Sequence, residues 1–448
     1  MTEEEQEFDN MINTYLESIR GTMSGIPEFE IRFGTKGKHT ISKINFDNVI
    51  QKLKSSNMSM YQPDSHSLKI ANKFLDKRTG MTKDSNVRIE LAGLHNIQSY
   101  CKTNLLDSQG VSPSYVQKNY AKIGERNIYP VDINKLNLRA SFQMEKSVPA
   151  HGSFAQNISS NWADNKKTFR YLNRTSFIHP DYPIRFDLSI VKEGNQEEIE
   201  FKGRKKWVQK PEYTIQTANV FDNIEKYEIE LEVLNNKVGL GTEFNTPQKL
   251  SHILKKAIRL VLAGLQNTNY PIPYNNIYDI GREYLQLVHK KEYNVKMQMR
   301  SNMFLGPQPI TLQMMNIAPI NEDVIVPNIR NDYTVTEKAD GMRKLLFINN
   351  EGKMYLIDTN MNIQFSGAMT KNVDLKKTIL DGEHILHNKK GEFKKEIQNM
   401  KLNGFVRARV NGEVISLEEK IILNKKFKHT LETVVDRLVI KESMGKRL

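Results

Sequence analysis

Apolar and polar residues alternate with a period of two through much of the first half of the chain. The alternation is clearest in four segments, at residues 28–33, 138–145, 185–190 and 227–233. Successive side chains of a β-strand point to opposite faces, so each segment predicts a strand with one apolar face and one charged or polar face. Alternation of this kind is typical of antiparallel sheets. The pattern therefore predicts a sheet-rich, antiparallel domain over residues 28–235.

Helical spacing appears on both sides of this region. An amphipathic helix is predicted near the N-terminus by apolar residues three and four apart, which are Phe8, Met11, Ile12, Tyr15, Leu16 and Ile19. Thr246-Pro247 resembles a helix cap with proline at the first helical position, and an apolar stripe follows it to Leu265. We expect helices to accompany the sheet.

The second half of the chain has shorter elements. A Pro/Gly-punctuated stretch at residues 305–327 predicts the start of a new domain, and short strands follow at residues 333–336, 344–348 and 354–357. Further on, apolar and polar residues alternate at 405–410, which predicts a strand. Asn411-Gly412 is a hairpin turn signal, and residues 413–417 are predicted to form the second strand of the hairpin. This tail is predicted to be a small β-rich module.

Composition excludes several classes of protein. The 448 residues contain 38% hydrophobic and 26% charged residues, which is too apolar for a disordered chain. The single cysteine, Cys101, excludes a disulfide framework and a cysteine-ligated zinc site, and favours a reducing compartment. The acidic N-terminus lacks the basic start and apolar run of a signal peptide. No stretch approaches the roughly 20 apolar residues of a membrane span, so we expect no membrane partner.

The net charge of +13, from 65 Lys and Arg against 52 Asp and Glu, favours polyanions such as nucleic acid or nucleotides. A generally lysine-rich proteome is the alternative explanation. The charged faces of the predicted strands are more informative. Glu28 and Glu30 point the same way about 6.6 Å apart, and Glu228, Glu230 and Glu232 do the same on another strand. Such carboxylates repel one another unless a cation lies among them, and they suit Mg²⁺ or Mn²⁺.

Basic residues accompany these carboxylates. Arg32 shares a face with Glu30, and further arginines lie on or near other strands, at Arg139, Arg170, Arg174 and Arg185. Guanidinium groups suit phosphate oxygens, so a metal with arginines describes a triphosphate site. The alternative is that these residues form the solvated outer face of an ordinary antiparallel sheet.

Two of the glutamate strands, Glu28-Phe-Glu-Ile-Arg and Tyr227-Glu-Ile-Glu-Leu-Glu, resemble the first and last strands of triphosphate tunnel metalloenzymes. The closest group is the metal-dependent RNA 5′-triphosphatases of fungi and large DNA viruses. Their basic strands resemble the segments at residues 170–176 and 185–189. The resemblance covers residues 25–235 and implies eight antiparallel strands that close into a tunnel.

The resemblance also implies roles for residues. Glu28, Glu30 and Glu232 would hold Mg²⁺ or Mn²⁺, with Glu228 as a further candidate ligand, and Glu230 would orient the attacking water. Phosphates of a 5′-triphosphate RNA would be held by basic residues, which are Arg32, Arg139, Arg170, Arg174, Arg185 and Lys206. The chain departs from the family at Leu172 and Asn173, where relatives often carry a second basic residue. Arg170 or Lys206 are the candidate substitutes.

A lysine motif, Thr336-Glu-Lys-Ala-Asp-Gly-Met-Arg343, lies in the second half. A deprotonated lysine can attack a nucleotide α-phosphorus. Asp340 and the following glycine allow a tight turn, Arg343 adds an anion contact, and Glu383 suits a metal or a ribose hydroxyl. The alternative is an exposed Lys338 in an ordinary turn.

With Glu383, this motif resembles motifs I and III of the covalent nucleotidyltransferases, which include capping guanylyltransferases. The resemblance implies that Lys338 takes GMP from GTP, with Asp340, Arg343 and Glu383 contacting the nucleotide or its metal. A tunnel triphosphatase before a guanylyltransferase is the order of capping enzymes in large DNA viruses. This implies a cytoplasmic protein, at a viral factory or in a virion.

After Glu383 the motifs expected of a guanylyltransferase stop. Residues 388–440 instead resemble the bacterial excision-repair subunit UvrA, in the part that meets its UvrB partner, which implies contact with a repair protein. The junction is open to three explanations: a natural fusion, a mis-assembled gene and a constructed chimera.

We therefore predict an α+β protein with three parts. These are a triphosphatase tunnel domain at residues 1–295, a partial guanylyltransferase domain at 296–388 and a UvrA-like tail at 389–448. The predicted function is mRNA 5′-capping, with an incomplete guanylyltransferase. The alternatives are a tunnel phosphatase acting on nucleotides, tripolyphosphate or thiamine triphosphate, and a non-enzymatic module that binds nucleic acid or a repair partner.

Overall fold

The computed structural model describes most of the chain as far as residue 384 and shorter pieces beyond it. The described residues are 2–20, 25–34, 40–76, 81–201, 203–290, 299–306, 311–319, 326–330, 342–384, 393, 397–398, 400–401, 406–410, 413–419, 421, 423 and 431–434. The chain divides into two compact units. One is Met1–Phe304 with Phe347–Ile379, and the other is Leu305–Leu346 with Leu380–Leu448. The three-part division into residues 1–295, 296–388 and 389–448 stays a prediction.

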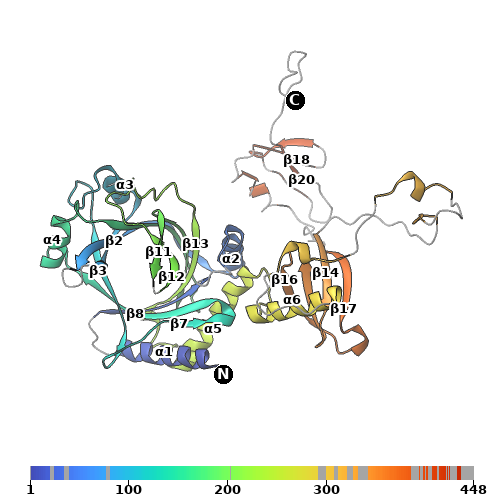
Figure 1. Ribbon diagram of the computed structural model, residues 1–448, viewed down its shortest axis with the longest axis horizontal. Helices are drawn as coiled ribbons and strands as arrows, with labels where there is room; N and C mark the ends of the chain where they lie inside the picture. The colour runs from blue at the N-terminus through green and yellow to red at the C-terminus, as the bar shows by residue number, and fades with distance from the viewer. Residues whose placement is uncertain are drawn as a thin grey trace, which may run out of the picture. The chain divides into compact units, whose positions relative to one another are not determined.

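Eight antiparallel strands close into a barrel within the first unit (Figure 1). The barrel strands are β1 (Ile26–Phe33), β2 (Ser59–Asp76), β3 (Met81–Ala92), β4 (Ser114–Tyr120), β8 (Leu138–Val148), β9 (Lys167–Ile178), β10 (Ile184–Glu193) and β13 (Lys226–Val233). Their order is β1-β13-β10-β9-β2-β3-β4-β8, and β8 pairs with β1 to complete the ring. The short strand β7 (Val131–Ile133) adds to β8. The predicted eight-stranded antiparallel tunnel is confirmed.

Helices cover the outer surface of this barrel and bury its apolar face. One core joins β1, β8 and β13 to α1 (Glu3–Arg20), α2 (Lys43–Ser55) and α5 (Pro247–Leu265). A second core joins β2, β3 and β9 to α3 (Leu94–Thr103) and α4 (Ser153–Ser160). The apolar residues of β1, such as Phe29 and Ile31, are fully buried in the first core. The alternate, polar residues are therefore left to face the barrel interior.

Local signals account for several of these elements. The helix predicted from the spacing of Phe8 to Ile19 is confirmed as α1, whose apolar side chains pack against β1. The predicted cap of α5 is also confirmed, because the Thr246 hydroxyl accepts a hydrogen bond from the Lys249 amide at 3.4 Å. The four alternating segments lie in β1, β8, β10 and β13, as predicted.

Smaller sheets complete the description. Two hairpins pair β5 (Lys122–Ile123) with β6 (Arg126–Asn127), and β11 (Gln196–Phe201) with β12 (Arg204–Gln209). A four-stranded sheet has the order β16-β15-β14-β17, from β14 (Met342–Ile348), β15 (Lys353–Asp358), β16 (Ile363–Met369) and β17 (Thr378–His384). A helix, α6 (Tyr274–His289), precedes it in the chain. Short 3₁₀ turns occur at Asn134–Leu136, Asn235–Lys237, Ser301–Met303, Met314–Asn316 and Val373–Leu375.

The tail contains a three-stranded sheet of β18 (Arg407–Val410), β19 (Glu413–Ser416) and β20 (Leu431–Val434). Val410 pairs with Glu413, as expected for strands joined by a two-residue turn. β18 and β19 lie within the two segments predicted as strands of the tail. The turn residues Asn411 and Gly412 and the strand predicted at residues 333–336 lie outside the described residues. Among the described helices, none is long and apolar enough to cross a bilayer.

Candidate functional site

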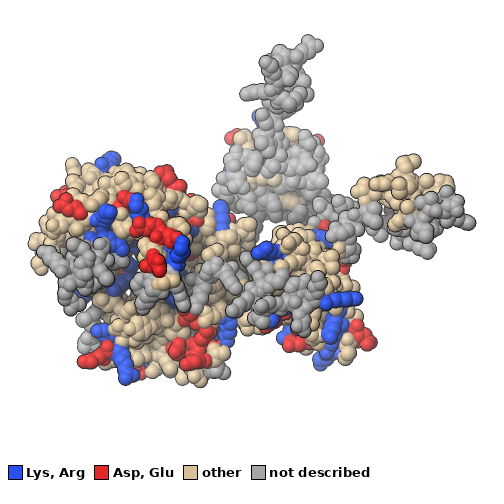
Figure 2. Space-filling model, in the orientation of Figure 1, with Lys and Arg blue, Asp and Glu red and all other residues tan. Residues whose placement is uncertain are grey.

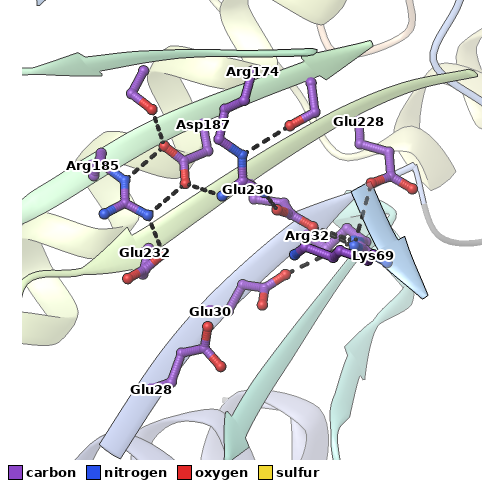
Figure 3. A network of polar contacts seen from close by, with 12 residues as sticks. Glu28, Glu30, Arg32, Lys69, Arg174, Arg185, Asp187, Glu228, Glu230 and Glu232 are labelled. Atoms are coloured by element: carbon purple, nitrogen blue, oxygen red, sulfur yellow. Dashed lines mark hydrogen bonds and ion pairs between the residues drawn. The ribbon is translucent and has the colours of Figure 1, made fainter. Parts of the chain in front are cut away.

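Five glutamates and an arginine line one wall of the barrel interior, on the neighbouring strands β1 and β13 (Figure 3). Glu30 lies directly opposite Glu232, and Arg32 lies opposite Glu230. Residues directly opposite each other in an antiparallel pair share a face, so these side chains meet inside the barrel. The period of two adds Glu28 on β1 and Glu228 on β13. The solvated-outer-face alternative is therefore wrong, because helices cover the outer face.

Asp187 on β10 positions two arginines beside this wall. Arg174 Nη1 donates to one carboxylate oxygen of Asp187 at 2.9 Å, and Arg185 Nε donates to the other at 2.8 Å. The Ser176 hydroxyl also donates to Asp187, at 2.7 Å, and the aspartate is only 1% exposed. Sequence reasoning assigned no role to Asp187. Its place in the segment Arg185-Phe-Asp-Leu-Ser189, two residues from Arg185, was the available signal.

The same two arginines reach the glutamates. Arg174 Nη2 donates to Glu230 at 2.8 Å, and Arg185 donates to Glu232. Arg32 donates to Glu230 at 2.7 Å through its Nε and lies 3.4 Å from Glu228. Four of the six predicted phosphate-binding residues thus lie in one network, because Arg170 also contacts Glu228. The network alternates in charge around the barrel.

A second charged cluster lies on the four other strands of the ring, β2, β3, β4 and β8. Lys69 (β2) lies 4.0 Å from Glu90 (β3), and Arg88 lies 2.5 Å from the same carboxylate. Lys118 (β4) lies 3.3 Å from Glu145 (β8). Lys118 also contacts Glu28 and so joins this cluster to the glutamate wall. Figure 2 shows basic and acidic side chains side by side around the barrel opening.

Sequence reasoning missed this second cluster, although a signal was present. Residues 87–91, Val-Arg-Ile-Glu-Leu, alternate in the same way as the four segments that were singled out. Lys69 lies directly opposite Arg170 in the β2–β9 ladder, close to the family departure at Leu172. Lys69 and Arg170 therefore place two basic side chains next to each other on the barrel lining.

Two predicted phosphate-binding residues lie apart from the network. Arg139 lies opposite Arg32 in the β1–β8 ladder, but its guanidinium donates to Asp132 at 2.8 and 3.1 Å. Lys206 is exposed on the β11–β12 hairpin, where it pairs in register with Ile199. Within the described part of the chain, Lys206 makes no ion pair with the barrel lining.

Burial and like charge separate the pKa values of the glutamates. Burial, followed by the charge of Glu230, raises the pKa of Glu30 to about 8, and Arg32 only partly opposes this. Burial would also raise the pKa of Glu230, but Arg32 and Arg174 outweigh it and hold that pKa well below its ordinary range. Burial raises the pKa of Glu232, against the opposing charge of Arg185. At neutral pH, Glu230 is ionised and Glu30 is largely protonated.

The donor chemistry of Glu28, Glu30 and Glu232 fits a hard divalent cation. Glu30 has a single cation partner within the described residues, Arg32 at 3.9 Å, and its pKa is raised first by burial and then by the charge of Glu230. In the parts of the chain that the structure describes, no three acidic side chains converge on one metal-binding point. A cation would therefore have to displace Lys118 from Glu28 and Arg185 from Glu232.

The predicted nucleotidyltransferase residues are only partly described. Lys338 and Asp340 lie outside the described residues. Arg343 on β14 donates to Asp381 on β17 at 3.1 and 2.7 Å, so its guanidinium holds a neighbouring strand. Glu383 is exposed on β17 and contributes to the raised pKa of Arg343, which arises first from the bond to Asp381.

Residues 378–448 match the UvrA interaction domain family. A UvrABC system protein A of Rickettsia felis is 37% identical over 121 residues, which are 26% of this chain and 12% of that protein. That of Rickettsia prowazekii is 47% identical over 64 residues, 14% of this chain and 7% of that protein. The chain thus spans about an eighth or less of these curated relatives. The predicted resemblance of the tail is confirmed, and the match begins early enough to include Glu383.

Among solved structures, the S. pombe Pct1 RNA triphosphatase aligns with 58% of this chain and 92% of its own, at 11% identity and a TM-score of 0.32. The PH1012 protein of Pyrococcus horikoshii OT3 aligns with 52% of this chain and 89% of its own, at 10% identity and a TM-score of 0.25. Scores this low do not establish a shared fold. The closure of the barrel follows from its own strand pairings.

Mn²⁺ binding should strengthen as pH rises and should release a proton. Below a pKa of about 8 the proton on Glu30 competes with the cation, so affinity should rise between about pH 6 and about pH 8 and then level off. Isothermal titration calorimetry in two buffers of different ionisation enthalpy measures both quantities. Glu30→Gln should bind Mn²⁺ weakly at every pH. An affinity for Mn²⁺ that does not change with pH in the unmodified protein would contradict this assignment.

Removing Asp187 should destabilise the barrel. Asp187→Ala leaves Arg174 and Arg185 without their shared carboxylate, so the free energy of unfolding should fall by about 3–5 kcal/mol. Urea unfolding measures this loss. Asp279→Ala is the matched control, because it removes the exposed pair with Arg282 and should cost less than about 1 kcal/mol. Equal losses in the two variants would show that Asp187 does not organise the network.

Proposed function

We propose that the barrel is a metal-dependent phosphohydrolase acting on the 5′-triphosphate of RNA, within an mRNA-capping protein. The observation that carries the proposal is the set of five glutamates on β1 and β13 facing arginines and lysines inside a closed barrel. A triphosphate brings negative charge that the basic side chains can pair with, and hard oxygen atoms that share a divalent cation with carboxylates.

Each group has a distinct role in this proposal. Glu28, Glu30 and Glu232 would hold Mg²⁺ or Mn²⁺, which supplies charge stabilisation for the phosphoryl group. Arg174 is held by Asp187 and points toward the glutamate wall, where its guanidinium can donate a hydrogen bond to a phosphate oxygen. The low pKa of Glu230 keeps it ionised, so it can accept a hydrogen bond from an attacking water and orient it.

The cations of the lining would change partners when a triphosphate binds. Arg170, Arg174 and Arg185 now bond to glutamates, and a guanidinium can exchange a carboxylate for a phosphate without losing its charge-assisted hydrogen bonds. The carboxylates released in this way become available to the divalent cation. The paired network is thus consistent with a site that loads metal and phosphate together.

RNA is preferred over nucleotides or tripolyphosphate because of the Lys338 motif that follows the barrel in the chain. A partial guanylyltransferase at residues 296–388 would place the two activities in the order used for capping, and the UvrA-like tail would contact a repair protein. A small-molecule tunnel phosphatase and a non-enzymatic binding module are the alternatives. Phosphate release from triphosphate-ended RNA, nucleoside triphosphates and tripolyphosphate distinguishes them.

Replacing Glu30 and Glu232 together by alanine should reduce phosphate release from triphosphate-ended RNA, with Mn²⁺ present, by at least about a hundredfold, because two proposed ligands are lost. Glu198→Ala with Glu200→Ala is the matched control. This variant also removes two glutamates on a strand, but they are exposed on β11, so activity should be retained. Activity that survives in the first variant would remove the metal-site proposal. RNA binding without phosphate release by the unmodified protein would favour the binding module.

The chain should form no stable covalent adduct with GMP. The segment in which a guanylyltransferase would continue after Glu383 matches the UvrA interaction domain family, so we infer that the phosphate-contacting motifs of transfer are missing there. Incubation with labelled GTP and Mg²⁺ or Mn²⁺, followed by denaturing electrophoresis, tests this. A labelled band that Lys338→Arg abolishes would overturn the expectation and establish Lys338 as a nucleophile.

A further inference from the structure

An exposed pair of tyrosines lies where β4 leaves the barrel. Tyr120 ends β4, and Tyr129 follows the β5–β6 hairpin. Their ring centroids are 5.4 Å apart, with an angle of 60° between the rings. Tyr120 is 41% exposed and Tyr129 is 65% exposed. Two adjacent aromatic rings left in solvent form a surface on which a flat, apolar group can stack.

The strand geometry relates this pair to the barrel interior. Lys118 faces inward, because it contacts Glu28 and Glu145, and the period of two gives Tyr120 the same face of β4. Tyr120 also lies opposite Gln143, whose other neighbour across the sheet is Glu28. The tyrosine pair therefore continues the barrel lining at the mouth where β4 ends and β8 begins, here called the β4 mouth.

Basic residues accompany the pair on the β5–β6 hairpin and on β8. Lys122 and Arg126 are exposed on the β5–β6 hairpin, where Glu125 is the acidic residue between them. Arg139 lies at the start of β8, and the pKa of its guanidinium is raised, first by the bond to Asp132 and in smaller part by Tyr120. Tyr120 is therefore near Arg139. Aromatic rings beside lysine and arginine are the combination that holds single-stranded nucleic acid, through stacking and backbone contacts.

We propose that Tyr120 and Tyr129 stack on the first bases of an RNA whose 5′-triphosphate lies among the arginines of the barrel. This inference rests on the proposed function and adds the mouth through which the RNA leaves. Arg139 and Arg32 are opposite each other in the β1–β8 ladder, so two guanidinium side chains lie side by side where β1 ends and β8 begins. Stacking without base-edge contacts predicts little sequence preference.

The opposite mouth supplies a matched control. Tyr61 is 56% exposed near the start of β2, next to Met60, which pairs with Phe177 near the end of β9. In an antiparallel barrel the strand that begins at one mouth ends at the other, so β2 begins at the mouth opposite to that at which β4 ends. Tyr61 is thus an exposed tyrosine of the same barrel at the wrong end for the proposed RNA path.

Fluorescence anisotropy of a labelled RNA oligomer with a 5′-triphosphate, measured without divalent metal so that it stays intact, tests the proposal on the full chain. Tyr129→Ala should weaken binding by about fivefold to a hundredfold, the loss of one stacked base. Tyr129→Phe should bind as the unmodified protein does, because the ring is kept. Tyr61→Ala should weaken binding less than Tyr129→Ala does, because Tyr61 lies at the other mouth and its link to the proposed site is its influence on Arg185. Circular dichroism confirms that each variant is folded.

Two outcomes would overturn the proposal: unchanged binding in both Tyr129→Ala and Tyr120→Ala, or a loss confined to Tyr61→Ala. Failure of the unmodified protein to bind the RNA would also overturn it. Phosphate release from inorganic tripolyphosphate, which carries no base, tests the proposed hydrolase separately. A protein that hydrolyses tripolyphosphate but loses no RNA affinity in the tyrosine variants keeps its proposed function and lacks this RNA path.

Discussion

The repulsion among the glutamates of β1 and β13 is the constraint on which the barrel interior depends. Two like charges about 4 Å apart cost about 4 kcal/mol at an effective dielectric constant of about 20. Five carboxylates on adjacent strands are tolerated because every one of them has a cationic neighbour, from Lys118 at Glu28 to Arg185 at Glu232. Glu30 has the longest such contact, and its pKa is raised, first by burial and then by the charge of Glu230. The negative charges of the interior are thus offset by the surrounding cations as a group, and not one pair at a time.

This constraint also explains where the apolar cores lie. A barrel filled with ion pairs cannot supply a hydrophobic core of its own, so the apolar faces of its strands are turned outward. The helices then bury them, with α1, α2 and α5 over β1 and β13 and α3 over β2 and β3. Stability and chemistry are therefore separated by the sheet: the outer surface provides the buried apolar area, and the inner surface is free to be polar.

Local sequence patterns predicted the strands and their faces well, because a period of two depends only on neighbouring residues. The same-face placement of Glu28 and Glu30, or of Glu230 and Glu232, follows directly from it. The closure of β1 onto both β8 and β13 came from the resemblance to a family, since pairing of segments about 200 residues apart leaves no local trace. The predicted site residues that lie on barrel strands, such as Arg174 and Arg185, do come together in one network.

The misplaced and missed residues have the same cause. Lys206 lies on a strand, but that strand, β12, belongs to a separate hairpin with β11. Arg139 is on the right face, but Asp132 on a neighbouring strand accepts its hydrogen bonds. Lys69 and Lys118 were missed because the carboxylates that they contact, Glu90 and Glu145, lie on neighbouring strands. The register between paired strands decides which side chains meet inside a barrel. That register cannot be read from the sequence of a single strand.

The pairing of β1 with β13 has a consequence for how the protein folds. Residues 26–33 cannot pair with residues 226–233 until the later segment has been made. Bringing together segments so far apart has a large cost in loop-closure entropy. Topologies dominated by such distant contacts fold slowly. During synthesis the first strand leaves the ribosome long before the last, so the barrel stays open along the edge that carries Glu28 and Glu30. The placement of Glu30 opposite Glu232 would therefore be completed in one late step, when the final strand closes the ring.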